Sequence, residues 1–87
     1  LLIILKDTLV DKVLDGYGNT ALIVAVEKGD IKNVQTLIQN GANIEAVNFN
    51  GWTALICASY NGRFEMVEYL IQKRANVSVV SNDGWSA

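Results

Sequence analysis

Two short segments of this sequence carry residue types that could take part in catalysis. Glu65 and Glu68 stand three positions apart, so a helix would present both carboxylates on one face. Such a pair can serve as general acid and base, but a solvated helix face explains the same spacing and is the interpretation we favour. Gly16-Tyr17-Gly18 has two glycines in the manner of a phosphate-binding loop, yet the Gly-Lys-Ser/Thr continuation is missing. Neither segment therefore predicts a catalytic or nucleotide-binding site.

Histidine is absent and Cys57 is the only cysteine. A Ser-His-Asp or Cys-His site is therefore impossible within these 87 residues, and the usual zinc sites lack ligands. Cys57 lies in an apolar run with no activating group nearby in sequence, which favours a small buried side chain over a reactive thiol. We predict no catalytic residue, no metal site and no cofactor, and hence a protein that is not an enzyme. A lone cysteine forms no internal disulfide, which fits an intracellular, cytoplasmic location.

Composition and charge narrow the classes of partner. The chain is 51% hydrophobic and 18% charged, with a net charge of −2. Its 7 basic residues alternate with acids and form no stripe, which argues against nucleic-acid binding. The apolar segment Leu1–Leu5 is far too short to cross a bilayer, so we expect a buried helix end and no membrane insertion. The high apolar fraction is explained most simply by apolar surface that meets neighbouring units.

The strongest pattern is a repeat of 33 residues. The segment 18–25 (GNTALIVA) returns at 51–58 (GWTALICA) and begins again at 84–87 (GWSA). Superposing residues 15–54 on 48–87 gives 17 identities in 40 positions. Unrelated segments of ordinary composition would share about two or three. A fixed period of this size is the signature of stacked structural units, which usually bind partners rather than transform substrates.

Each copy of the repeat predicts two helices separated by a glycine turn. Thr20 and Thr53 stand just before the first helix of their copies, where a hydroxyl suits the N-cap. Gly29 and Gly62 follow that helix, as glycine does at helix ends. The second helix carries an apolar stripe at i, i+3, i+6 and i+7, formed by Ile31, Val34, Leu37 and Ile38 and repeated as Phe64, Val67, Leu70 and Ile71.

After the second helix, the chain is expected to turn and to run extended toward the next copy. Gly41 occupies the turn in the first copy, whereas Arg74 must adopt in the second the conformation that glycine favours. The connections span residues 44–50 and 77–83 and end in the turn dipeptides Asn-Gly and Asp-Gly, which predict a hairpin-like tip without a sheet. The residues predicted to form the core are Leu22, Ala25, Val34, Leu37, Ile38, Leu55, Ala58, Val67, Leu70 and Ile71.

The repeat frame predicts a single domain over residues 1–87. It divides into the end of a partial unit (1–14), two complete units (15–47 and 48–80) and the start of a further partial unit (81–87). Leu1, Ile4 and Leu5 align with the stripe of the second helix, so the chain is expected to open inside that helix of a preceding unit. Because repeat arrays usually need about three units and polar caps, we infer a piece of a longer array.

On a 33-residue period, the chain shows the motif Gly-x-Thr-x-Leu-x-x-Ala, then a glycine, then a Val-x-x-Leu-Ile helix and then Gly-Ala-Asn-Ile. This pattern resembles the ankyrin repeat. The resemblance covers the whole chain and implies an all-α solenoid of helix-turn-helix units joined by short hairpin-like loops. It also implies a protein–protein interaction module without catalysis. The chain departs from the family motif where proline is replaced by Ala21, Ala54 and Ala87 and histidine by Ile23 and Ile56. In the family that histidine helps to tie neighbouring repeats by hydrogen bonds, whereas isoleucine can only pack.

The resemblance also implies where a partner binds, because ankyrin repeats vary at the turn tips and along the exposed side of the first helix, which line a concave groove. Carried over position by position, the partner-binding residues are Tyr17, Asn19, Glu27, Lys28, Phe49, Asn50, Trp52, Tyr60, Asn61, Asn82, Asp83 and Trp85. Five of them are aromatic, and aromatic side chains dominate binding hot spots. Trp52 and Trp85 are in register and are expected to form a row, although packing on the neighbouring turn explains them equally well.

Three functional interpretations remain open on the sequence alone. In the first, which we favour, the chain grips another protein through this groove. In the second, it is the recognition domain of a larger enzyme or channel. In the third, it is a structural spacer that stacks on flanking repeats of its parent chain. Stacking on such repeats is expected in all three, and the identity of a protein partner is not encoded in any motif that we find.

Overall fold

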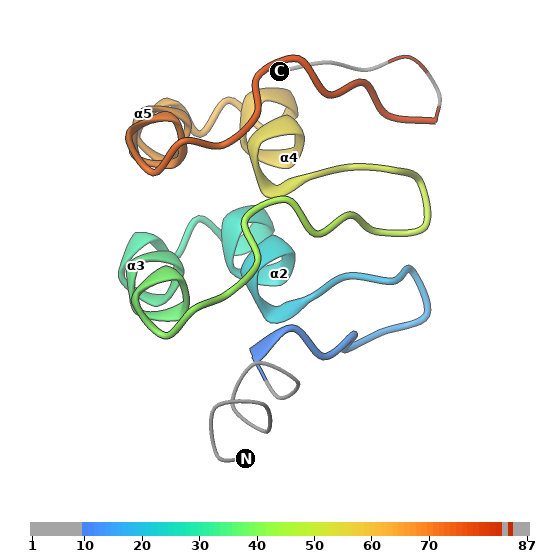
Figure 1. Cartoon of the computed structure of the whole chain (residues 1–87), viewed down its shortest axis with the longest axis horizontal. Helices are drawn as coiled ribbons and strands as arrows, with labels where there is room; N and C mark the ends of the chain where they lie inside the picture. The colour runs from blue at the N-terminus through green and yellow to red at the C-terminus, as the bar shows by residue number, and fades with distance from the viewer. Residues whose placement is uncertain (1–9, 83, 85–87) are drawn as a thin grey trace.

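The structure, a computed structural model, describes residues 10–82 and 84. Across these residues it contains four helices: α2 (Ala21–Lys28), α3 (Ile31–Gln39), α4 (Ala54–Tyr60) and α5 (Phe64–Gln72). Helices α2 and α3 form one pair, α4 and α5 form the next, and α4 packs on α2 (Figure 1). The expected all-α repeat fold is therefore confirmed. The helix expected around Leu1, Ile4 and Leu5 and the one expected to begin at Ala87 lie outside the described residues.

The helix ends follow the turn chemistry of the sequence. Thr20 Oγ1 accepts the N–H of Ile23 at 3.5 Å, and Thr53 Oγ1 accepts the N–H of Ile56 at 3.2 Å. Both threonines are thus the N-caps that the sequence predicts. Gly29 ends α2 with a φ of 75°, in the left-handed region where glycine carries no Cβ penalty.

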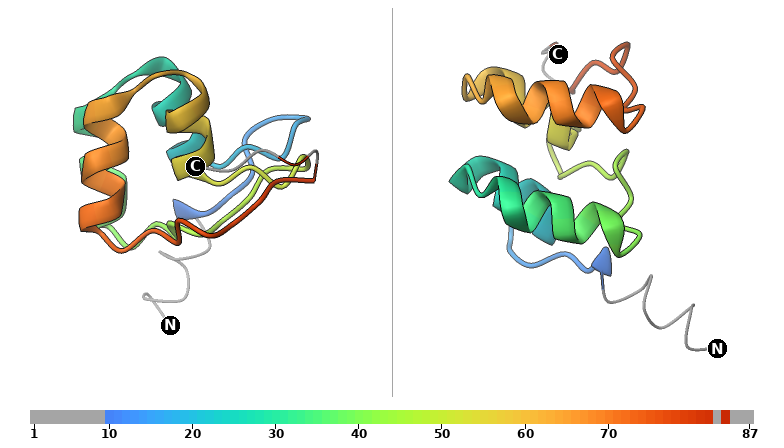
Figure 2. Two further views of the ribbon diagram at one scale, coloured as in Figure 1. Left: turned by 90° about the horizontal axis from the view of Figure 1, so that it is seen from above. Right: turned by 90° about the vertical axis from the view of Figure 1, so that its left-hand side faces the viewer.

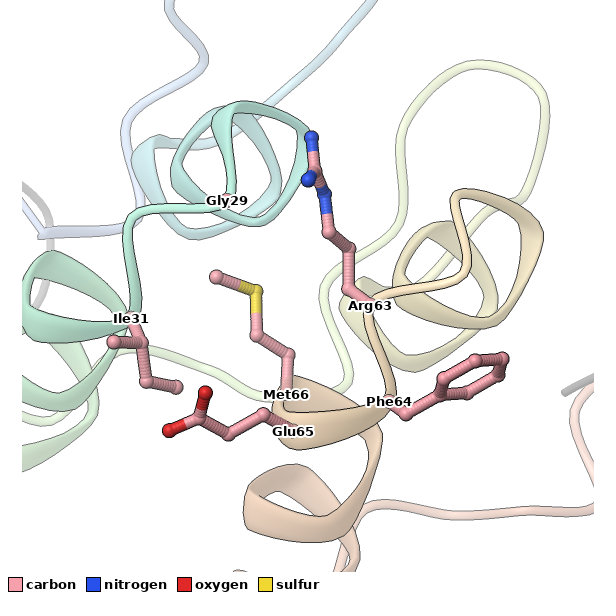
Figure 3. Close-up of a pocket in the computed structure, with 6 residues that line it drawn as sticks. All are labelled: Gly29, Ile31, Arg63, Phe64, Glu65 and Met66. Atoms are coloured by element: carbon pink, nitrogen blue, oxygen red, sulfur yellow. The ribbon is translucent and has the colours of Figure 1, made fainter.

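The core lies between the helix pairs and confirms most of the predicted set. Within the second unit, however, Ile71 is 47% exposed, so its predicted place in the core is wrong. Phe64, which begins the same apolar stripe, is 77% exposed. Met66, which the stripe omitted, is buried and points toward Gly29 and Ile31, while Phe64 points away (Figure 3). The counterparts in the first unit, Ile31 and Ile38, pack against the core. In the described part of the chain, no helix pair covers the corresponding side of α5 (Figure 1).

The extended connections leave the helices on one side of the molecule and stack above one another (Figure 2). An antiparallel bridge joins Val13 to Thr20 at the base of the loop that precedes α2, consistent with a hairpin-like tip. None of the helices in residues 10–82 has the length and apolar character that crossing a bilayer requires. The stacked connections, together with α2 and α4, form the surface on which the predicted binding residues lie.

Candidate functional site

Asp15 and Asn48 shape the two loops of this surface. Asp15 Oδ1 accepts hydrogen bonds from the backbone N–H groups of Tyr17 (2.9 Å) and Asn19 (3.1 Å). Asn48 Oδ1 does the same one repeat later, for the N–H groups two and four positions further along (3.0 Å each). A side chain that satisfies two backbone donors holds a tight turn without help from a sheet. The two loop tips therefore have equivalent shapes.

The tips are also joined to one another along the stack. The Phe49 N–H donates to the Tyr17 carbonyl at 2.9 Å, and the Asn82 N–H donates to the Asn50 carbonyl at the same distance. The Phe49 ring lies so close to Gly18 (φ 79°) that an added Cβ would be only 2.5 Å from it. Glycine is needed there both for its φ and for this close approach. These contacts make the loop tips a continuous surface.

A chain of side-chain hydrogen bonds runs beneath the tips. Asn19 Nδ2 donates to Asp15 Oδ2 at 3.0 Å, and Asn48 Nδ2 donates to Asn19 Oδ1 at 3.1 Å, so one unit is tied to the next. Asn19 is only 5% exposed, so its predicted place on an open surface is wrong. The reason is that Asn48, which sequence reasoning did not single out, covers it and uses its amide oxygen. The sequence contains a signal for this contact, because a polar residue stands three positions before the glycine of each copy: Asp15 before Gly18 and Asn48 before Gly51.

These hydrogen bonds also affect the ionisation of Asp15. Desolvation acts to raise its pKa, but hydrogen bonds from the backbone and side chain of Asn19 and from the backbone of Tyr17 favour the charged carboxylate. The pKa of Asp15 consequently lies below its ordinary value. The carboxylate is thus charged at neutral pH and is a stable acceptor for the loop.

A hollow of about 290 Å³ opens between the two loops and the end of α2. We call it the loop hollow, and its lining consists of Tyr17, Asn19, Glu27, Asn48, Asn50 and Trp52. Trp52 is half-buried and meets the Tyr60 ring edge-on, with centroids 4.9 Å apart and planes inclined by 64°. Four of the predicted binding residues besides Asn19 therefore line one hollow, and Tyr60 contacts one of them, Trp52.

Most of the predicted binding residues are exposed at the loop tips and at the helix ends. Tyr17 and Phe49 are 72% and 70% exposed at the loop tips, and Tyr60 is 57% exposed at the end of α4. The other exposed members of the predicted set are Glu27, Lys28, Asn50, Asn61 and Asn82. Asn61 also donates its Nδ2 to the Cys57 carbonyl at 2.9 Å and so closes the end of α4. Asp83 and Trp85 lie outside the described residues, so the expected row of tryptophans stays a prediction.

Cys57 is buried in α4, in the core. Desolvation, and secondarily the negative charge of Glu27, raises the pKa of its thiol to about 12. At neutral pH a thiol of this pKa supplies almost no thiolate, which is the nucleophilic form. Glu65 and Glu68 are exposed. Within the described residues, no three histidine, cysteine or acidic side chains come together as metal ligands.

A second hollow, of about 210 Å³, lies at the helix turns on another face of the molecule (Figure 3). Arg63 crosses its rim, and its Nη2 donates to the Glu27 carbonyl at 3.0 Å. A Cβ added at Gly29 would be 3.0 Å from that guanidinium. Arg63 therefore ties the end of α2 to the turn that precedes α5, a role that sequence reasoning missed. The sequence signal for this role is that arginine stands in the second unit at the position equivalent to Asp30, the N-cap of α3 in the first unit.

Comparison with known proteins agrees with this architecture. Residues 1–83 match a family model described as ankyrin repeats in three copies. A stretch of 37 residues is 51% identical to the transient receptor potential cation channel subfamily A member 1 of Homo sapiens. That stretch covers 42% of this chain and only 3% of the channel protein. Because the family match extends over nearly the whole sequence, the chain belongs to the ankyrin repeat family.

Proposed function

We propose that this chain binds another protein, without turnover, through the surface formed by the loop tips, the loop hollow and the ends of α2 and α4. Ankyrin repeats generally serve as protein-interaction modules. The observation that carries the proposal is the exposure of three large aromatic side chains on this surface. Tyr17 lines the loop hollow, Phe49 lies at the neighbouring loop tip, and Tyr60 contacts Trp52 in the wall of the hollow. Such side chains bury a large area at a low cost in side-chain entropy, and they are enriched at binding hot spots.

The rigidity of the loops supports the same function. Asp15 and Asn48 fix each tip from inside, and the hydrogen bonds from Phe49 and Asn82 fix the tips relative to one another. A surface that is already ordered loses little conformational entropy when a partner binds. The buried amide chain therefore contributes to binding by holding the aromatic side chains in place, without contacting the partner.

The experiment is affinity capture with the 87-residue chain and two variants. Tyr17→Ala combined with Tyr60→Ala removes two exposed rings of the proposed surface, and neither substitution leaves a cavity in the core. Phe64→Ala is the matched control, because it removes an equally exposed ring that lies outside the loop hollow. We expect proteins captured by the unmodified chain and by Phe64→Ala to be lost from the double variant.

Circular dichroism of the variants provides the necessary check of folding. If the double variant keeps its helix content and still captures every protein that the unmodified chain captures, the proposed surface is wrong. That result would favour the structural-spacer function, in which the aromatic rings only stiffen the stack. Loss of capture by Phe64→Ala alone would place the binding surface on the face that carries α5.

A second candidate function is recognition or scaffolding inside a larger enzyme or channel. The 51% identity over 37 residues to a human cation channel favours the channel version. Under this candidate, the protein that encloses this chain has transmembrane or catalytic segments elsewhere, and the loop hollow binds a regulator or a neighbouring domain. Sequencing the complete transcript tests it, because a transcript encoding repeats alone would contradict it. Both candidates fit a cytoplasmic location, where Cys57 stays reduced.

A further inference from the structure

We propose that the loop hollow receives a positively charged side chain, arginine or lysine, presented by the protein partner. The inference rests on the proposed function and specifies its chemistry. Its basis is the combination of aromatic and acidic side chains in one hollow: Tyr17 and Trp52 from the two loops, and Glu27 from the end of α2. Aromatic faces attract cations, and a carboxylate adds a direct electrostatic attraction.

The two aromatic walls differ in exposure and in rigidity. Tyr17 is 72% exposed at the loop tip. Trp52 is half-buried, and its edge-on contact with Tyr60 at 4.9 Å restricts the plane of the indole. Tryptophan binds cations best among the aromatic residues, and the attraction grows as the cation loses water. The loop hollow therefore offers a fixed indole on one side and an adjustable phenol on the other.

Glu27 supplies the negative charge. Its side chain is exposed at the end of α2 and lines the loop hollow. Arg63, a nearby cation, donates to the Glu27 carbonyl instead of the carboxylate. Lys28 follows in the sequence but does not line the loop hollow. The acidic group is thus available to a cation that comes from outside.

The other groups that line the loop hollow favour a cation over an anion. Asn48 uses its amide oxygen for two backbone N–H groups and its Nδ2 for Asn19, so these groups are already satisfied. No lysine or arginine lines the loop hollow, so an anion would meet Glu27 without any compensating charge. The net charge of −2 adds to the attraction of a cationic segment.

The test is a selection of random displayed peptides on the immobilised 87-residue chain, followed by binding measurements on the selected peptides. We expect arginine or lysine to be enriched at one position. Replacing that residue by glutamine in the peptide should weaken binding by about threefold to tenfold. Glu27→Gln should weaken binding of the cationic peptide by a similar factor and leave binding of the glutamine peptide unchanged. Glu68→Gln, which removes the same charge from α5, is the matched control and should leave both affinities unchanged.

Two results would overturn the inference, and they differ in what they say of the proposed function. If selected peptides lose binding with Tyr17→Ala plus Tyr60→Ala but show no cationic preference and no response to Glu27→Gln, the surface binds proteins without this contact. If no selected peptide depends on Tyr17 and Tyr60, both proposals fall together. The substitution in the peptide requires no variant protein, so it tests the preference for a cation even if a variant of the chain fails to fold.

Discussion

Asn48 is joined to Asn19 of the preceding unit by a hydrogen bond of 3.1 Å from its Nδ2 to the amide oxygen of Asn19. Both side chains are buried, and Asn19 is joined in turn to Asp15. Ile23 and Ile56, which replace the histidine of the family motif, are buried and pack. A hydrogen-bonded tie between successive units is therefore present in the loops, directly behind the surface that we propose binds a partner.

Asn48→Ala should destabilise the chain by about 1–3 kcal/mol, because it leaves the buried Asn19 oxygen and two loop N–H groups without their partner. Urea unfolding followed by circular dichroism measures the change. Asn33→Ala is the matched control, because Asn33 is exposed on α3 and alanine suits a helix. Equal urea midpoints for Asn48→Ala and the unmodified chain would show that the amide chain does not stabilise the stack.

Asp15 should make the free energy of unfolding depend on pH in the acid range. Its folded pKa is below its unfolded value, so its contribution is present above the unfolded pKa and is lost as the pH falls through the folded pKa. Asp15→Asn keeps an acceptor oxygen for the turn, as Asn48 does one repeat later, but cannot titrate. We expect urea unfolding at about pH 6 and about pH 3 to differ less for Asp15→Asn than for the unmodified chain. An unchanged difference would show that the loop does not favour the carboxylate.

The helices could be predicted because their signals are local. Thr20 and Gly29 bracket α2 within the sequence, and the 33-residue period places the start of α4 at Ala54, although α4 ends one residue earlier than α2 does in the repeat frame. The stripe in α5 was predicted less well because burial there depends on neighbours. Phe64 copies the spacing of Ile31, but in the described residues nothing covers it, while Met66 is buried because it faces the first unit.

The candidate site shows the same division between local and non-local information. Exposure of Tyr17 and Tyr60 followed from their variable positions in the repeat, and both are exposed. Burial of Asn19 could not be predicted, because its partner Asn48 is 29 residues away and belongs to the next loop. A periodic sequence indicates which positions are equivalent, but it does not state which polar groups pair between units.

Cys57 should be inert toward thiol reagents in the folded protein. Its thiol is buried, and its pKa of about 12 leaves almost no thiolate at about pH 8. We expect labelling by a disulfide reagent to be slow in buffer and rapid in urea. Because the folded pKa is raised, the stabilising effect of the neutral thiol is present below its unfolded pKa and is lost as the pH rises toward about 12. Rapid labelling of the native chain would show that α4 opens readily.

Arg74→Gly should stabilise the chain by about 0.5–1 kcal/mol, because Arg74 adopts a φ of 66° that costs a residue with a Cβ more than glycine. The turn is the same in both units. The N–H of Ala75 donates to Leu70 in the second unit, as that of Ala42 donates to Leu37 in the first, each at 3.0 Å.

The reciprocal substitution Gly41→Arg places arginine in the first copy of that turn, where φ is 91°, and should destabilise the chain by about 1 kcal/mol. A higher urea midpoint for Arg74→Gly together with a lower one for Gly41→Arg would attribute the effect to the left-handed backbone. A lower midpoint for Arg74→Gly would show that contacts of the arginine side chain outweigh the strain of the backbone at this turn. The pair thus separates conformational strain from side-chain contacts at a position where the two repeats differ in sequence but not in shape.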